Sequence, residues 1–150
     1  MKLNLEKIGK KNICLIGLMG SGKSIIGKLL SKDLNLLHFD SDSMIEKKLK
    51  KTVSRIFLDH GEEYFRLTEE EMIISMLKKK KCVISLGGGA ILSKKIRECL
   101  KKKSLTIFLD VSIEILYERL KNSKKRPLLK NNNIKSKLNN LYEERKKYYK

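Results

Sequence analysis

The sequence has few of the residues on which disulfide-bonded and zinc-binding domains depend. Its 150 residues include only three cysteines, Cys14, Cys82 and Cys99, and no two of them have Cys-x-x-Cys spacing. An odd number of widely separated cysteines argues against a disulfide framework and against a structural zinc site. We therefore expect free, mostly buried thiols in the reducing environment of the cytoplasm.

Long apolar runs are also missing. The longest notable run, Met72 to Leu77, is interrupted by Ser75, whereas a membrane-spanning helix needs about 20 predominantly apolar residues. Residues 1–12 contain lysine and asparagine and no apolar stretch of the length found in signal peptides. The sequence thus predicts a cytoplasmic protein with no membrane partner.

Acidic residues are scarce, because 17 Asp and Glu face 35 Lys and Arg, for a net charge of +18. Such a charge favours nucleic acid as a partner, and small polyanions after it. However, only six of the basic residues are arginine, and the chain has nine asparagines, sixteen isoleucines and one alanine, Ala90. Lys, Asn and Ile have A/T-rich codons, so genomic base composition explains the charge as well as a polyanionic partner does. We expect the lysine-rich stretches at 78–81 and 101–103 to be solvent-exposed, and we expect no nucleic-acid partner.

Length and hydrophobic pattern predict a single α/β domain over residues 1–150. A chain of this length fits one compact domain. Short apolar runs typical of buried strands alternate with stretches of helical periodicity, which favours helices around a mostly parallel sheet. The expected strands are residues 12–17, 36–39, 82–86 and 105–110, and the expected helices are residues 24–34, 44–51, 62–80, 93–101, 112–122 and 134–150, with a break at His60-Gly61.

The strongest chemical signal is the segment Gly17 to Ser24, whose sequence GLMGSGKS fits the pattern G-x-x-x-x-G-K-[ST]. It lies between a predicted strand and a predicted helix, where backbone N–H groups can surround phosphate oxygens and the helix N-terminus favours an anion. Lys23 would reach the β- and γ-phosphates, and the Ser24 hydroxyl would bind Mg²⁺. The sequence predicts a nucleoside-triphosphate site. Its ATP-binding residues are Gly20, Ser21, Gly22, Lys23, Ser24 and Ile25.

Two carboxylates follow the second predicted strand. Asp40 and Asp42 are two residues apart, so in an extended chain both would face the phosphate loop. One can hold Mg²⁺, and the other can accept a proton from an acceptor hydroxyl or orient it. Alternatively, Asp42 only caps the helix that follows.

Gly87-Gly88-Gly89 ends the third strand, where many P-loop enzymes have an acidic residue for Mg²⁺, so Asp40 is the better metal candidate. The three glycines either allow close approach to a ligand or form a tight turn.

Arginine is rare in this sequence, so its positions are informative. Arg66, Arg119, Arg126 and Arg145 are four of the six, and an arginine kept against a lysine background indicates a need for a planar, bidentate group. Two of them could clamp a substrate carboxylate, and one could reach the charge that develops on a phosphoryl group. Each could instead be a surface ion-pair partner.

Taken in order, these motifs resemble those of the shikimate kinase family. The matching segments span nearly the whole chain: GLMGSGKS, DSD, FRLTE at 65–69, GGG, RPLL at 126–129, and Arg145 with Tyr149 four residues later. A P-loop alone indicates only an NTPase or kinase, whereas the ordered set is specific to this family. The resemblance implies a three-layer α/β/α P-loop fold and phosphoryl transfer from ATP to shikimate. The product would be shikimate 3-phosphate, on the route to chorismate and the aromatic amino acids.

The resemblance also implies roles for individual residues. Asp42 is the catalytic base or orienting group, and Lys23 and Arg126 assist it. Arg126 belongs to a lid at residues 123–133, and Arg119 packs on adenine. Ser24 and Asp40 hold Mg²⁺, and the shikimate-binding residues, most of them in the region 40–70, are Asp42, Phe57, Phe65, Arg66, Glu69, Gly88 and Arg145.

The chain departs from the family pattern at its C-terminal side. Lys147 stands where many relatives have a proline, and we expect a further strand and a closing helix to be missing, which would expose a strand edge. Alternatives therefore stay open: another small P-loop kinase for gluconate or a nucleoside monophosphate, a weakened shortened homologue, or a basic nucleic-acid-binding module. We expect a monomer with small-molecule partners, and we expect His38 and His60 to be structural.

Overall fold

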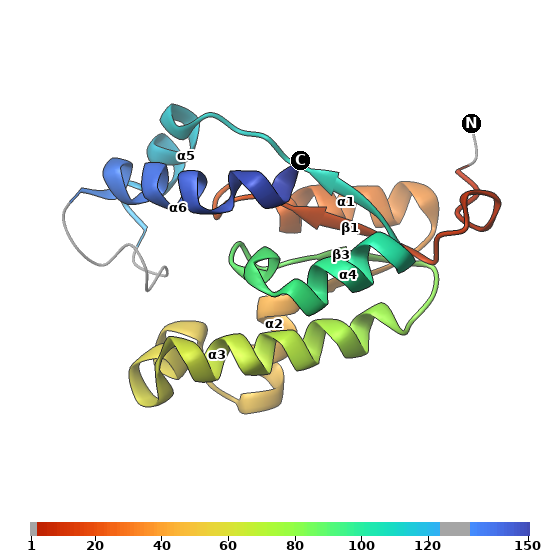
Figure 1. Cartoon of the computed structure of the whole chain (residues 1–150), viewed down its shortest axis with the longest axis horizontal. Helices are drawn as coiled ribbons and strands as arrows, with labels where there is room; N and C mark the ends of the chain where they lie inside the picture. The colour runs from red at the N-terminus through yellow and green to blue at the C-terminus, as the bar shows by residue number, and fades with distance from the viewer. Residues whose placement is uncertain (1–2, 124–132) are drawn as a thin grey trace.

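The computed structural model, shown in Figure 1, describes residues 3–123 and 133–150. Four strands form one sheet in the order β2-β3-β1-β4, and all three pairings between them are parallel. The strands are β1 (Asn12–Ile16), β2 (Leu37–Asp40), β3 (Cys82–Ser85) and β4 (Ser104–Phe108). This confirms the predicted α/β class with a parallel sheet.

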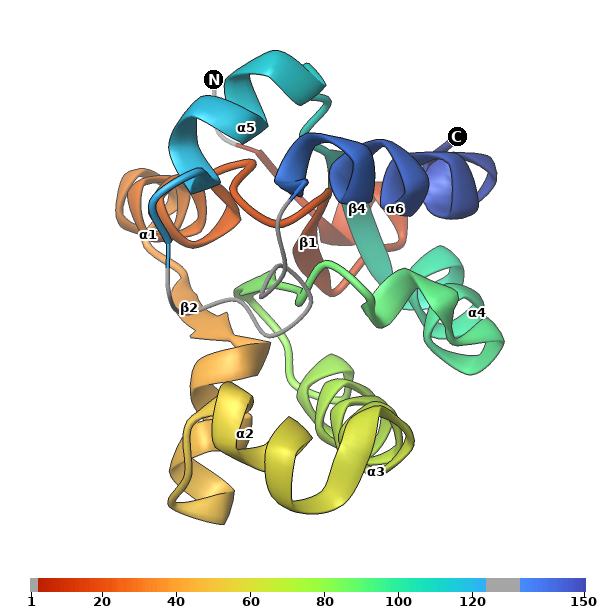
Figure 2. The same cartoon turned by 90° about the vertical axis from the view of Figure 1, so that its left-hand side faces the viewer.

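Helices cover both faces of the sheet, which makes three layers. They are α1 (Lys23–Leu34), α2 (Ser41–Leu49), α3 (Val53–Leu77), α4 (Lys94–Lys103), α5 (Ile113–Leu120) and α6 (Ile134–Tyr149), with short 3₁₀ turns at Glu6–Ile8 and Ala90–Leu92. Figure 2 shows α1 on one side of the strands and α4 on the other. Alternate strand side chains point to opposite faces, so Cys14 and Ile84 pack with α3 and α4 while Ile13 and Val83 face α1.

The strand register brings the predicted motifs together. Ser85, the last residue of β3, pairs with Leu15 on one side and with Asp40 on the other. Because the strands are parallel, their carboxyl ends meet at one edge of the sheet, where ligands of open α/β folds bind. The phosphate loop after β1, the carboxylates after β2 and the glycines after β3 therefore share that edge.

The second helix begins earlier than its pattern predicts, at Ser41 and not at Met44. Asp40 is its N-cap, because the carboxylate accepts a hydrogen bond of 3.1 Å from the Ser43 N–H. Asp42 thus lies in the first helical turn, and the expectation of an extended chain from Asp40 to Asp42 is wrong. Asp42 does not cap the helix either, but a carboxylate in a first turn is favoured by the helix dipole.

The predicted break at His60-Gly61 is a kink inside a long helix. Helix α3 begins at Val53, so Phe57 and Leu58 are helical and do not lead into a loop. Gly61 has φ 84° and ψ 172°, a non-helical conformation that is open to glycine. The kink turns the first part of α3 back over α2, as Figure 2 shows.

Part of the apolar pattern of α1 faces outward, while Leu30 and Leu34 pack against the cluster of Ile13, Leu15 and Val83. Ile25 and Leu29 are 69% and 60% exposed. Gly27 and Ser31 occupy the buried face instead. The physical reason is the close approach of α1 to the sheet at Gly27, where a Cβ would overlap the Ser85 hydroxyl and the His38 imidazole.

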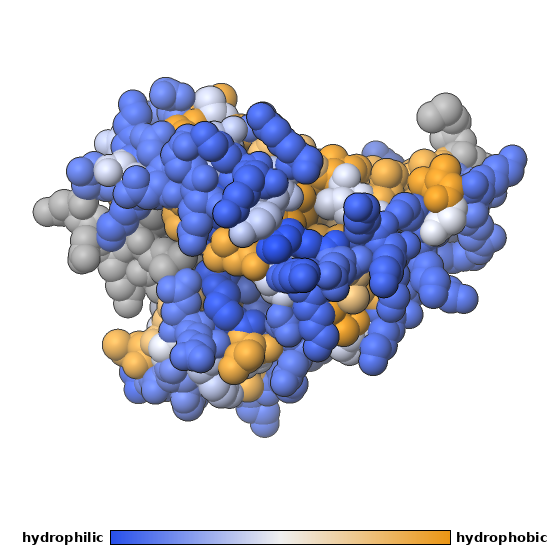
Figure 3. Space-filling view, in the orientation of Figure 1, coloured by the Kyte–Doolittle hydropathy of each residue, from blue (hydrophilic) through white to orange (hydrophobic). Residues whose placement is uncertain are grey.

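Lysines lie on the surface, as predicted. Residues 78–81 and 101–102 are exposed, and Figure 3 shows hydrophilic residues over most of one face, with small hydrophobic patches between them. No helix in the two described ranges is both long and apolar enough to cross a membrane.

The cysteines are free thiols, as predicted. Cys14 and Cys82 are buried, and Cys99 is half-buried. Burial raises the pKa of the Cys14 thiol to about 12. A thiol in such an apolar setting stays protonated and unreactive at neutral pH.

Candidate active site

The phosphate loop lies beneath a pocket at the carboxyl edge of the sheet. Lys23 Nζ lies 2.9 Å from both the Gly17 and the Leu18 carbonyl oxygens, so the side chain curls over its own loop. The buried Ser21 hydroxyl is 3.4 Å from the same ammonium. The pocket, of about 220 Å³, is lined by Met19, Gly20, Gly22, Lys23, Ser24, Ile25, Asp40, Asp42, Leu86, Gly87 and Gly88.

A hydroxyl and a carboxylate face each other in this pocket. Ser24 Oγ donates a hydrogen bond to the Asp40 carboxylate. Both are hard oxygen donors, and Mg²⁺ in kinase sites is held by one or two carboxylates together with substrate phosphates and water. The pair therefore fits Mg²⁺, as the sequence predicts.

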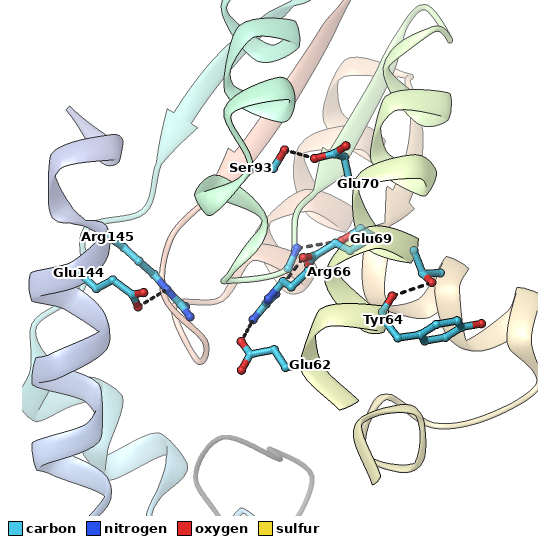
Figure 4. A network of polar contacts seen from close by, with 11 residues as sticks. Glu62, Tyr64, Arg66, Glu69, Glu70, Ser93, Glu144 and Arg145 are labelled. Atoms are coloured by element: carbon cyan, nitrogen blue, oxygen red, sulfur yellow. Dashed lines mark hydrogen bonds and ion pairs between the residues drawn. The ribbon is translucent and has the colours of Figure 1, made fainter. Parts of the chain in front are cut away.

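Two arginines meet in a second pocket nearby. Figure 4 shows Arg66 reaching from α3 and Arg145 from α6 into the space between these helices. Arg145 is only 1% exposed. The Phe57 and Phe65 rings, whose centroids are 4.8 Å apart, form an apolar wall. The lining residues are Met19, Asp42, Val53, Phe57, Phe65, Arg66, Glu69, Gly87, Gly88, Gly89 and Arg145, which include every predicted shikimate-binding residue.

Carboxylates organise one of the two arginines. Arg66 Nη1 donates to Glu69 at 2.8 Å and Nη2 donates to Glu62 at 3.3 Å. Burial opposes the charge of Arg66, but the charges and hydrogen bonds of Glu69 and Glu62 together outweigh that effect and raise the pKa of the guanidinium. Burial also raises the pKa of Glu69, and the charge of Arg66 opposes that rise. For Arg145, burial lowers the pKa, and the nearby Arg66 adds to that effect.

Buried polar atoms without hydrogen-bond partners gather in this pocket. Among the described residues they include Arg66 Nε, Arg145 Nε, Arg145 Nη1 and Glu69 Oε1. Glu144 is the ion-pair partner of Arg145 Nε, at 3.9 Å, which is too long for a hydrogen bond. Buried polar groups are nearly always satisfied in folded proteins, so each exception needs an explanation. Three guanidinium nitrogens without a hydrogen bond in one pocket point to an anionic ligand with oxygen acceptors.

The glycine triplet lets three side chains approach the backbone. A Cβ at Gly87 would lie 2.6 Å from Glu69 Oε1 and 2.7 Å from Asp42 Oδ1, and a Cβ at Gly89 would overlap the Arg66 guanidinium. The close-approach interpretation of the triplet is therefore favoured over a simple turn. Gly87, Gly88, Met19 and Asp42 line both pockets, so the two are joined.

Of three further predicted nucleotide contacts, the structure places two at the phosphate loop or its pocket. Arg119, at the end of α5, donates from Nη1 to the Gly20 carbonyl at 2.8 Å, which places it beside the phosphate loop. Ile25 lines the phosphate pocket and is exposed. Arg126 and nearly all of the expected lid at 123–133 lie outside the described residues.

Sequence reasoning missed several residues of the site. Met19 and Val53 line the arginine pocket. Ser41 is fully buried, and its hydroxyl accepts a 2.8 Å hydrogen bond from the Gly87 N–H, which ties the glycine triplet to α2. The one available signal was the position of Ser41 between Asp40 and Asp42, two residues already predicted to belong to the site.

Comparisons with known proteins agree with this geometry. A sequence profile described as "Shikimate kinase" matches residues 19–150. The chain is 42% identical to the shikimate kinase of Rhizobium meliloti (strain 1021) over 142 residues, which cover 95% of this chain and 74% of that protein. It is 41% identical to the shikimate kinase of Wigglesworthia glossinidia brevipalpis over 143 residues, 95% of this chain and 83% of that one.

A solved structure has the same arrangement of elements. The shikimate kinase from Acinetobacter baumannii, in complex with shikimate, superposes with a TM-score of 0.91 at 34% identity, covering 97% of this chain and 82% of that one. Sequence profile, relatives and structure all indicate one family.

Proposed function

The chain belongs to the shikimate kinase family, and from this premise we propose how its own residues carry out the ATP-dependent phosphorylation of shikimate. The observation that carries the proposal is the junction of the two pockets at Asp42. One pocket has the loop and lysine that suit phosphates. The other has guanidinium nitrogens without hydrogen-bond partners, which suit a carboxylate. Phosphoryl transfer depends mainly on positioning and charge neutralisation, which such a junction can supply.

ATP would place its phosphates over the loop. The N–H groups at the start of α1 have no intrahelical partners, so they can bind phosphate oxygens. Lys23 would turn from the loop carbonyls to the β- and γ-phosphates. Arg119, already bonded to the Gly20 carbonyl, would lie on the nucleotide side of the loop.

Mg²⁺ would be held by Ser24 and Asp40, whose oxygens face each other. When bound, it would neutralise phosphate charge and so favour attack by an oxygen nucleophile. Asp40 also caps α2, which fixes its carboxylate without help from the metal.

Shikimate would bind through its carboxylate to Arg145 and Arg66. The guanidinium nitrogens that lack hydrogen bonds would gain acceptors. Charge-assisted hydrogen bonds of this kind are stronger than hydrogen bonds between neutral groups. Glu69 would keep Arg66 oriented, and the Phe57 and Phe65 rings would contact the apolar side of the substrate ring. Asp42 would accept the proton of the hydroxyl whose oxygen bonds to the γ-phosphorus, while the bond to the ADP oxygen breaks.

The central test is nucleotide turnover that depends on shikimate. We expect ADP release from ATP only when shikimate is added. Mass spectrometry should show a product in which a phosphoryl group has replaced one hydroxyl hydrogen of shikimate. A shikimate analogue with its carboxylate reduced to an alcohol is the matched control, and it should bind poorly. Folded protein that releases no ADP in response to shikimate would contradict the proposal.

Gly89→Ala is expected to weaken shikimate binding without unfolding the protein. Gly89 has φ −93° and ψ −4°, the conformation of the third residue of a type I turn, which is open to alanine. The new methyl group would displace the Arg66 guanidinium, and loss of a charged hydrogen bond predicts a KM for shikimate that rises about 10- to 100-fold. Steady-state kinetics with each substrate varied in turn check this. The KM for ATP should not change, and an unchanged KM for shikimate would contradict the role given to Arg66.

We propose that residues 1–150 act as one kinase domain, that Arg126 assists the transfer, and that the protein works as a cytoplasmic monomer with no nucleic-acid or membrane partner. Size-exclusion chromatography with light scattering tests the oligomeric state.

A further inference from the structure

We infer that Ser85 and His38 form a hydrogen-bond relay that positions the first turn of α1 for the nucleotide. Both residues lie beneath the phosphate loop, outside both pockets. Both would be positioning residues, because they act through the backbone of Lys23 and touch no substrate. The inference rests on the proposed function only for its activity readout.

The direction of the relay follows from the hydrogen-bond inventory. Ser85 Oγ lies 2.7 Å from the Lys23 carbonyl oxygen and 2.9 Å from His38 Nε2. The carbonyl can only accept, so the single hydroxyl proton of Ser85 goes to it. Ser85 Oγ must then accept from His38, which requires the proton of the imidazole on Nε2.

Helix α1 packs directly against the relay. Ser85 is 1% exposed and ends β3, and His38 lies half-buried on β2, at the edge of the sheet. Gly27 of α1 rests directly on both side chains, and a Cβ there would overlap Ser85 Oγ and His38 Nε2. These two polar groups therefore limit how closely this turn of α1 approaches the sheet, while Leu30 and Leu34 pack against the sheet further along the helix.

The held carbonyl determines the direction of a phosphate-binding N–H. The C=O of Lys23 and the N–H of Ser24 belong to one planar trans peptide, so they point in opposite directions. The Ser24 N–H is among the first four of α1, which have no partner within the helix and suit a phosphate. Fixing the Lys23 carbonyl against the sheet therefore aims the Ser24 N–H at the pocket that Ser24 lines. The same peptide joins the lysine of the loop to the serine proposed for Mg²⁺.

The first test measures nucleotide binding. Ser85→Ala removes the donor to Lys23, and a lost buried hydrogen bond predicts an affinity for ADP that falls about 3- to 10-fold by calorimetry. The KM for ATP should rise in parallel while the KM for shikimate stays within about twofold. His38→Leu should have a similar effect, and His38→Gln, which keeps a donor nitrogen, should recover most of the affinity.

Ser31→Ala is the matched control. Ser31 lies on the same helix, and its hydroxyl donates to the Lys28 carbonyl at 2.8 Å, two turns from the phosphate loop. It should leave ADP affinity unchanged, whatever it does to thermal stability. Equal ADP affinities for Ser85→Ala and Ser31→Ala would overturn the inference. A different result would contradict the proposed function alone: wild-type protein binds ADP, Ser85→Ala weakens that binding, and the wild type shows no turnover with shikimate.

The second test needs no variant and so does not depend on variant folding. Long-range ¹H–¹⁵N spectra of the unliganded protein distinguish the two imidazole tautomers. We expect His38 as the Nε2–H tautomer with a slowly exchanging proton, and the exposed His60 as the internal control with fast exchange. An Nδ1–H tautomer at His38 would overturn the relay.

Discussion

Asp42→Asn is expected to lower kcat by about 10²- to 10⁴-fold, the usual contribution of a general base. Asparagine keeps the size of the side chain and its place in the first turn of α2, but its amide cannot take the hydroxyl proton. Asp42 lies at the junction of the two pockets, so the loss should fall on the transfer step. Steady-state assays should then show a KM for shikimate that changes far less than kcat.

Asp33→Asn is a suitable control for this substitution. Asp33 is exposed near the end of α1, and the change removes the same charge far from the carboxyl edge of the sheet. Its kcat should match that of the wild type. If Asp42→Asn turned over at a near-normal rate, Asp42 would be an orienting residue and some other group would have to accept the proton.

Lys23→Met is expected to lower kcat by about 10²- to 10³-fold, the effect of removing one preorganised group that stabilises developing charge. Lys23 is 9% exposed and packs along its loop, so methionine fills the space of the stem and leaves the fold intact. The lost ammonium acts on phosphate charge in the transition state, so kcat should fall more than the affinity for ADP. Single-turnover measurements separate the two.

Lys32→Met provides the matched comparison for Lys23→Met. Lys32 is an exposed residue in the last turn of α1, so it reports the cost of losing a lysine from this helix without touching the loop. Its kcat should equal that of the wild type. Full activity in Lys23→Met protein would overturn the assignment of the phosphate loop.

The sequence alone was sufficient for the fold class, and it predicted most of the residues that line the two pockets. Periodicity located the strands to within one or two residues, because strands buried on both faces, such as Asn12–Ile16 and Cys82–Ser85, are continuous apolar runs. The segment Gly17 to Ser24 could be identified from consecutive residues alone, because a backbone that surrounds phosphate needs glycines at fixed spacing. Arg66 and Arg145 stood out against a lysine background, and both line one pocket.

Helix boundaries and exposed faces were less predictable. The pattern at residues 24–34 predicted a helix, but it did not show that Gly27 and Ser31 would be buried or that Ile25 would be exposed. Periodicity reports only where apolar residues recur. It does not report how closely a helix approaches a sheet, which is decided here by what a Cβ at Gly27 would meet. Asp40 likewise became an N-cap because the chain turns directly from β2 into α2.

What the sequence determined by itself was therefore local: the phosphate loop, the alternation of strands and helices, and the residue types that the chemistry needs. The tertiary structure decided which of those residues meet. Parallel pairing brought Asp40, Ser85 and the glycines to one edge. Helix packing placed Arg145 near Arg66, although 78 residues lie between them in the chain. The relay from His38 through Ser85 to Lys23 was invisible in the sequence for the same reason. Each of its hydrogen bonds joins residues distant in sequence, and only the register of the sheet and the close approach of α1 bring them within reach.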